Sequence, residues 1–320
     1  MSAAELYADS LVKTRRRATH DEMEDRADFL IPYAAQHGPV TVRQLYYRAE
    51  VTGLPGIDKT EAAYAKIQRQ VLALRRAKRL DYECIADATR WMRKPQTHDS
   101  VEAALAATAQ AYRKALWRDC QDYVEIWCEK DALAGVIFPV TAESDVPLMV
   151  SRGFSSETFC FEAVDAARRH NKPYWVYYLG DLDRAGSDAA NSLKEKLGRF
   201  GAERGVRVSF QQLAIEADDV LRFNERDSQA LVFLPGVTAP DDLRWLPTRT
   251  PKRNSKADRN WPHPFAIELD AIEPDDLRAI VRAAIERHLP ADQFRILKIA
   301  EASERELITS LVSRLNGAAA

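Results

Sequence analysis

The segment from residue 122 to residue 214 alternates short apolar runs with longer amphipathic ones, and this pattern constrains the fold more than any other feature. Four strand-like runs occupy residues 122–128, 146–151, 174–180 and 206–214, and helical patterns of ten to twenty residues separate them. Strands joined by helices of that length form a parallel sheet with right-handed crossovers. We therefore expect a mixed α/β fold with a Rossmann-like parallel sheet, whose site lies at the carboxyl ends of the strands.

The amino-terminal part of the chain has a different pattern. Residues 22–36 are amphipathic, a second helix is expected from an N-cap at Thr41 to Gly53, and a third begins at Thr60. Two short strand-like pieces follow, at residues 80–88 and 89–95. Three helices and a small hairpin are the outline of a winged helix-turn-helix. The expected organisation is a winged-helix domain with N-terminal helices (1–95), a connector helix (96–120) and the sheet domain with a C-terminal extension (121–320).

Basic side chains gather on the third helix, although the net charge of the whole chain is only −2. We interpret five of them as candidate contacts to DNA phosphates: Lys59, Lys66, Arg69, Arg75 and Arg76. In a winged helix the third helix enters the major groove, where such residues neutralise phosphates. The plain alternative is a solvated helix face, which is the usual meaning of a run of charge.

Other classes of protein are excluded by what the sequence lacks. No apolar run approaches the ~20 residues that a membrane helix needs, and the first residues have no apolar signal-peptide core, so a cytoplasmic protein is expected. The four cysteines form no CxxC pair, and no GxxxxGK[ST] or GxGxxG occurs. Histidines, His263 among them, are scattered singly and receive no role.

Three carboxylates follow two of the expected strands. Glu129 comes directly after the first strand, and Asp181 and Asp183 come after the third. Parallel strands would bring these acids to one sheet edge, where they repel unless a cation relieves them. Oxygen ligands alone favour Mg²⁺. The competing interpretations are a helix N-cap, a haloacid-type phosphatase, which usually has DxDxT or DxDxV, and a glycosyltransferase DxD, and the last two give Glu129 no role.

Two adjacent tyrosines lie on the expected second helix, in the segment Arg43 to Tyr47 (RQLYY). Neighbours on a helix cannot both face the core, so one of the two must lie at the rim or in a cleft. A tyrosine phenol can attack a phosphodiester, but its ordinary pKa near 10 calls for a nearby cation. Arg43, one turn from Tyr47, could provide that charge.

Together these residues resemble the topoisomerase VI A subunit and its relatives, the meiotic double-strand-break transesterases. That family joins a winged-helix domain bearing R-x-[IL]-Y-Y to a Toprim domain bearing E…DxD, and the similarity extends from about residue 25 to 215. The resemblance implies that Tyr47 is the nucleophile and Arg43 its helper, and that Glu129, Asp181 and Asp183 hold Mg²⁺. It further implies cleavage of double-stranded DNA by a homodimer through a 5′-phosphotyrosyl link, with the tyrosine of one subunit serving the metal site of the other.

The chain also departs from that family. It has Asp-Leu-Asp-Arg-Ala-Gly where the family has D-x-D-P-x-G, and 151–156 (SRGFSS) replaces a G-x-G-x-P loop. No ATPase module is fused, so strand passage would need a separate ATPase or structural-maintenance-type partner. Three alternatives stay open: a minimal stand-alone A-subunit-like protein, a metal-dependent hydrolytic Toprim nuclease of a plasmid or phage defence system, and a DNA-binding scaffold with a degenerate site.

The last third of the sequence is less informative. Residues 247–264, rich in Pro, Lys, Arg and Asn, are expected to form a loop that could touch DNA. Glu268 and Asp270 follow, and they either join the metal site or lie on a solvated edge.

Overall fold

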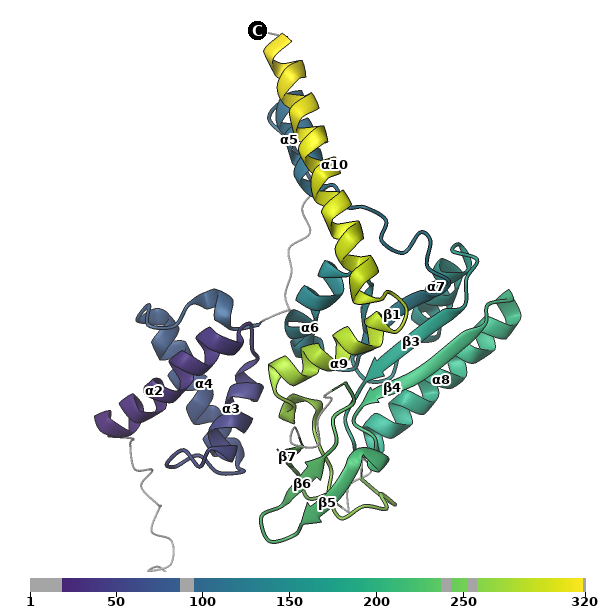
Figure 1. Ribbon diagram of the computed structural model, residues 1–320. Helices are drawn as coiled ribbons and strands as arrows, with labels where there is room; N and C mark the ends of the chain where they lie inside the picture. Colours follow the sequence, from purple (N-terminus) through teal and green to yellow (C-terminus); the bar gives the residue numbers. More distant parts are fainter. Residues whose placement is uncertain (1–18, 87–94, 237–242, 253–257, 319–320) are drawn as a thin grey trace, which may run out of the picture.

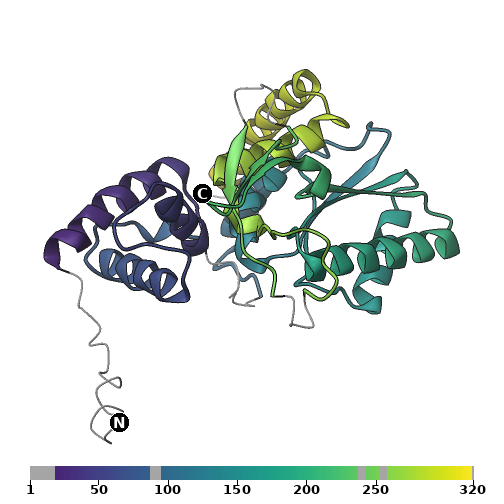
Figure 2. The ribbon, with the colours of Figure 1, turned by 90° about the horizontal axis from the view of Figure 1, so that it is seen from below.

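A computed structural model describes residues 19–86, 95–236, 243–252 and 258–318. The fold is mixed α/β: a cluster of amino-terminal helices lies beside a larger body built on a parallel sheet, and one long helix projects from that body (Figures 1 and 2). Within the described residues, no helix combines the length and the apolar character needed to cross a membrane.

Four parallel strands form the central sheet. They are β1 (Tyr123–Cys128), β2 (Leu148–Val150), β3 (Tyr174–Leu179) and β4 (Val208–Ala214), in the spatial order β2-β1-β3-β4. This confirms the four strands expected from the sequence. The chain leaves β1 toward β2 and then returns to the other side of β1 as β3. The crevice between the carboxyl ends of β1 and β3 is therefore a topological switch point, where open α/β sheets bind ligands.

Helices cover both faces of this sheet, because successive strand residues point to opposite sides. Ile126 faces a core shared with α6 (Asp131–Glu143) and α9 (Pro274–Glu286), whereas Trp127 faces a core shared with α7 (Glu157–Arg168) and α8 (Arg184–Arg204). Both strand residues are fully buried. Burial on both faces explains why these strands are continuous apolar runs in the sequence.

A second, antiparallel sheet follows β4, and the sequence did not suggest it. After the 3-10 helix η3 (Ala217–Asp219) come β5 (Val220–Asn224), β6 (Gln229–Val232) and β7 (Arg244–Pro247), in that order. The segment 247–264, expected to be a loop, starts at the end of β7, and Arg249 pairs with Ala266 in an isolated bridge. Ile267 then forms an isolated bridge with Leu182, and the chain enters the 3-10 helix η5 (Leu269–Ala271).

The three amino-terminal helices are α2 (His20–His37), α3 (Val42–Val51) and α4 (Glu61–Arg76), and they share one apolar core. Thr41 and Thr60 cap α3 and α4 as expected, each accepting a backbone N–H from three residues onward. The expected hairpin is not formed in its described part: residues 82–84 make a 3-10 turn, and only Ile85 bridges to Val40. Residues 87–94 lie outside the described part of the chain.

The expected connector helix is shorter than predicted. Helix α5 spans Val101–Ala111 and then gives way to irregular backbone, although the helical pattern continues to residue 119. Tertiary contacts explain the early end. The Tyr112 hydroxyl donates to Glu304 at 2.6 Å and the Lys114 N–H donates to Glu301 at 2.9 Å, both on the long helix α10 (Ala291–Ala318) that runs beside α5 (Figure 1).

Polar contacts hold the amino-terminal helices against the body. Arg48 of α3 pairs with Glu273, and Arg278 of α9 donates to the carbonyl of Pro39 at 2.7 Å and to that of His37 at 3.1 Å. Tyr47 packs against both apolar cores. Helix α3 is thereby placed next to η5.

Candidate functional site

Glu129 and Asp181 meet at the switch point, directly after β1 and β3. A Glu129 carboxylate oxygen accepts the backbone N–H of Asp181 at 3.0 Å. The close approach depends on Gly180, because a Cβ at that position would lie 2.9 Å from the same carboxylate and 2.6 Å from the Tyr178 ring. The structure therefore brings together two of the three acids that the sequence predicted.

Asp183 is the third predicted acid, and it is the N-cap of α8. One carboxylate oxygen accepts the Gly186 N–H at 2.7 Å, and the other accepts from Arg249 at 2.6 Å. Arg249 also pairs with the buried Asp258 at 2.8 Å. Asp183 thus has the capping role that the sequence left open for it, while its charge still acts on Glu129.

Lys130, to which the sequence analysis gave no role, occupies the centre of the acidic cluster. Its ammonium lies 2.9 Å from Asp181, 2.7 Å from Asp270 and 3.4 Å from Glu268. The last two acids flank the start of η5, and the Leu269 N–H donates to Asp181 at 2.7 Å. Glu268 and Asp270 therefore belong to the site and not to a solvated edge, while Lys130 neutralises part of their charge.

Burial and mutual repulsion shift the pKa values of the acids. Burial raises the pKa of Asp181 to about 7; Lys130 opposes that shift and the Glu129 charge adds to it. The pKa of Glu129 is raised by burial, against the hydrogen bond from Asp181, and Asp183 raises it further. Burial is therefore the main cause of both shifts, and a neighbouring carboxylate adds to each.

Tyr47 lies beside these acids in the same chain, whereas the family resemblance implies that the tyrosine of one subunit serves the metal site of the other. Arg43 pairs with Glu268 at 2.9 Å and hydrogen-bonds the Tyr47 phenol. Burial raises the pKa of Tyr47 and Glu268 adds to the shift, whereas Arg43 and Lys130 lower it. The neighbouring Tyr46 turns away and donates to the Asp58 carbonyl at 3.0 Å. As expected for adjacent tyrosines, only one of the two faces the candidate site.

The donor chemistry of this site suits Mg²⁺, but the arrangement of the side chains does not. Glu129, Asp181 and Asp183 supply the hard oxygen donors that Mg²⁺ prefers. Burial raises the pKa of Glu129 and of Asp181, the Asp183 charge adds to the first shift and the Glu129 charge to the second, and a divalent cation would relieve both. However, across the described residues no three His, Cys, Asp or Glu side chains are arranged as a ready metal site. Lys130 and Arg249 would have to give up Asp181 and Asp183 before all three could share one ion.

The residues predicted to contact DNA differ in their exposure and in the contacts that they make within the protein. Arg69 and Arg76 are exposed on α4, whereas the Arg75 guanidinium stacks over the Tyr82 ring at 4.2 Å. Lys66 donates to the Gly56 carbonyl at 2.7 Å. Lys59 is exposed, but its ammonium donates to the Ser228 carbonyl at 2.7 Å, which ties it to the antiparallel sheet.

The sequence analysis gave no role to two cations of the site, Lys130 and Arg249. Lys130 was detectable in principle, because it sits between Glu129 and Asp131 at the end of a buried strand. Arg249 gave no signal, since only the bridge to Ala266 brings it to Asp183.

The parts of the molecule thus define a doubly wound α/β protein with an acidic cluster at its switch point and a tyrosine beside that cluster. Comparison of the chain with protein-family models, with curated proteins and with solved structures finds no match.

Proposed function

We propose that this protein is a Mg²⁺-dependent enzyme that cleaves double-stranded DNA by transesterification through Tyr47, on a winged-helix domain joined to a Toprim domain. One observation carries the proposal: Tyr47, Arg43, Glu268, Lys130 and Asp181 form one continuous chain of contacts and charge interactions at the switch point. A nucleophile, its cationic neighbour and the candidate metal-binding acids are thereby next to one another.

In this proposal Glu129, Asp181 and Asp183 would hold the ion, which when bound supplies a Lewis acid for the scissile phosphate. The residues of the chain position the reactants. The Tyr47 oxygen forms a bond to phosphorus as the bond to the 3′ oxygen breaks. The phenol proton leaves to solvent and the 3′ oxygen takes one up. One phosphate ester replaces another, so resealing needs no added energy source.

Arg43 has two parts in this scheme. Its charge opposes the effect of burial on the pKa of Tyr47 and so favours the phenolate. It is also anchored by Glu268, which keeps the guanidinium beside the phenol. Cleavage of both strands requires two such centres and hence a homodimer, and a strand-passing reaction requires a separate ATPase or structural-maintenance-type partner.

A hydrolytic nuclease is the second candidate, and a specific observation favours it. Burial raises the pKa of Tyr47 above its ordinary value, which makes the phenol a weaker nucleophile at neutral pH. In a hydrolytic enzyme water would attack the phosphate at the same acids, and Tyr47 would be dispensable.

Labelled supercoiled DNA separates these candidates. The protein is incubated with the DNA and MgCl₂ and then denatured, and label attached to protein is counted. The test variant is Tyr47→Phe, and Tyr46→Phe is the matched control because its hydroxyl faces Asp58. Attached label that is lost only in Tyr47→Phe supports transesterification.

The other outcomes are equally informative. Cleavage without attached label that persists in Tyr47→Phe and disappears in Asp181→Asn supports hydrolysis. DNA binding without cleavage, with partner proteins supplied, contradicts both enzymatic proposals and leaves the DNA-binding scaffold, whose acids Lys130 and Arg249 already neutralise.

A further inference from the structure

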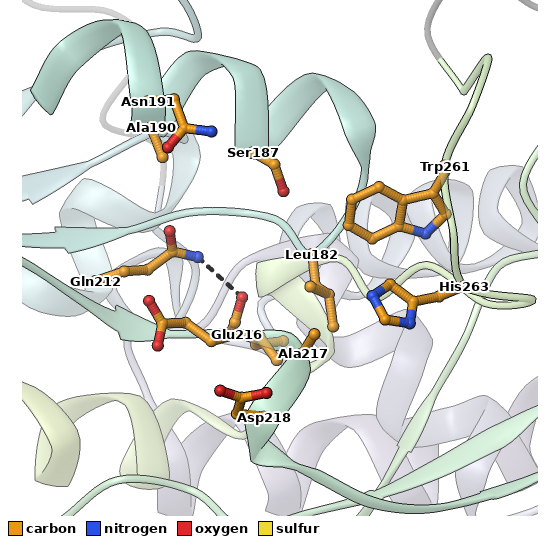
Figure 3. Close-up of a pocket in the computed structure, with 11 residues that line it drawn as sticks. Leu182, Ser187, Ala190, Asn191, Gln212, Glu216, Ala217, Asp218, Trp261 and His263 are labelled. Atoms are coloured by element: carbon orange, nitrogen blue, oxygen red, sulfur yellow. Dashed lines mark hydrogen bonds between the residues drawn. The ribbon is translucent and has the colours of Figure 1, made fainter. Parts of the chain in front are cut away.

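A cavity of about 380 Å³ lies on the other side of β3 from Lys130. Figure 3 shows it between α8, the end of β4 and the segment that carries Trp261 and His263. Its volume is at the small end of the range for ligand pockets, roughly 300–1,000 Å³. The cavity is therefore sized for one small ring system and its attached sugar.

An aromatic pair forms one wall of this cavity. The Trp261 indole N–H donates to the Phe265 carbonyl at 2.8 Å, which fixes the orientation of the ring. His263 meets it edge to face, with ring centroids 5.1 Å apart. Both side chains are half-buried and border the opening (Figure 3). A fixed, partly exposed indole is a surface on which a planar ring can stack.

Polar groups suited to a base edge lie across from the aromatic wall. The Gln212 amide is oriented by donating to the Ile215 carbonyl at 2.9 Å, and Ser187 and Asn191 line the cavity from α8 (Figure 3). Amides and hydroxyls both donate and accept, as the edge of a nucleobase requires. The carboxylates of Glu216 and Asp218 also line the cavity and would repel a phosphate. This set of groups selects a base and not a phosphate.

The cavity and the acidic cluster are adjacent in the chain. Leu182 lines the cavity and stands between Asp181 and Asp183. Ser187 lies one helical turn after the N-cap Asp183. The connection from β3 into α8 therefore contributes residues both to the acidic cluster and to the cavity.

We propose that this cavity binds a single unpaired nucleobase, stacked on Trp261, beside the phosphate that the acids act on. The inference rests on the proposed function for its choice of a DNA strand as the source of the base. A free mononucleotide carries the same ring, and the experiment separates the two sources.

The probe is a single-stranded DNA oligonucleotide with one 2-aminopurine, whose emission falls when it stacks. Binding is measured in EDTA, so no cleavage occurs. One stacked base is worth about 1–3 kcal/mol, so Trp261→Ala should weaken binding roughly 5- to 150-fold and restore the emission. Trp261→Phe should keep most of the affinity. Trp245→Ala, which removes a half-buried tryptophan on β7 outside the cavity, is the control and should bind like the wild type.

A second variant tests the cavity independently, in case Trp261→Ala does not fold. Ser187→Phe fills the cavity from α8 without touching the Trp261 hydrogen bond, and it should weaken binding by a similar factor. Wild-type affinity in both Trp261→Ala and Ser187→Phe, with unchanged circular dichroism, overturns the proposal. Competition by deoxyadenosine monophosphate at the affinity of the oligonucleotide supports a free nucleotide as the source, and its absence supports a strand.

Failure of this inference is distinguishable from failure of the proposed function. Asp181→Asn should still quench the 2-aminopurine in EDTA while losing cleavage with Mg²⁺. Cleavage by a wild type whose Trp261→Ala variant binds the probe normally overturns the cavity alone. A Trp261-dependent signal in a protein that never cleaves DNA keeps the cavity and removes the proposed reaction.

Discussion

Lys130 is one positive charge among three carboxylates: Asp181, which follows β3, and Glu268 and Asp270 at η5. Its charge is important for stability, because Asp270 is buried and Asp181 is half-buried beside it. A buried carboxylate that loses its partner must either stay charged at a large cost or take up a proton.

We therefore expect Lys130→Met to lower the free energy of unfolding by about 3 kcal/mol near neutral pH. The loss should shrink as the pH falls, because the orphaned acids then become protonated. Urea unfolding at pH 7 and pH 5 measures both effects. The control is Arg169→Met, which removes an exposed pair with Asp165 and should cost under about 0.5 kcal/mol; an equal loss in both variants would contradict the prediction.

Asp219 provides a second test at this scale. Burial raises its pKa from 3.8 to about 6, against a hydrogen bond from the Glu216 N–H and with the help of the Glu216 and Asp218 charges. The folded state therefore holds this proton more tightly than the unfolded state. Stability is highest below the unfolded pKa, falls as the pH rises through the folded pKa near 6, and stays reduced above it.

Asp219→Asn removes the charge and keeps an oxygen that can accept the Glu216 N–H. At pH 7 we expect the variant to be more stable than the wild type by on the order of 1–2 kcal/mol, with no difference at pH 4. Thermal unfolding at the two pH values checks this. An advantage of equal size at both would show that the charge of Asp219 is not its cause.

At the scale of elements, the sequence predicted the helices and strands that are set by burial or by a capping residue of their own. The strands β1 and β3 were predictable because both their faces are buried, and α3 and α4 because Thr41 and Thr60 cap them. The antiparallel sheet was not, since no residue of β5 is buried and β6 and β7 are four residues each. Helix α5 ends where contacts to α10 override its propensity.

Helix α4 carries a prediction about DNA. Arg69→Ala with Arg76→Ala should weaken binding to double-stranded DNA and reduce the slope of log K against log salt by about 2, one for each phosphate contact. Lys59→Ala is the control, because that lysine is committed to the Ser228 carbonyl. Fluorescence anisotropy over a salt series measures the slope. An unchanged slope in the double variant would remove α4 from the DNA interface.

At the scale of the whole molecule, the site exists because two separate parts of the chain dock. Glu129 and Asp181 were predictable as neighbours from strand order alone. The approach of Tyr47 to Glu268 was not, because it depends on polar contacts between α3 and η5 that are more than 200 positions apart in the sequence.

Arg278 makes the main contacts of that docking: it donates to the carbonyls of His37 and Pro39, before α3, while a third bond to Val136 on α6 stays within the body. Arg278→Ala should weaken docking by about 2 kcal/mol, since the two hydrogen bonds between the parts are lost. Hydrogen exchange of the α3 amides should then become faster. Arg282→Ala, one turn along α9, removes only an exposed pair with Glu143 and should leave the exchange unchanged. Equal protection in the two variants would show that Arg278 does not hold the parts together.

The projecting helix has a mechanical consequence. Its 28 residues extend about 42 Å at 1.5 Å per residue, and the buried Glu301 braces it by accepting from Lys114, Lys298 and Arg305. A stiff helix of that length acts as a lever, so a small force on its free end produces a torque at the end that joins the body. That root is joined to α9, which follows η5 in the chain, so the arm is connected through two elements to Asp270 and the lysine that it pairs with.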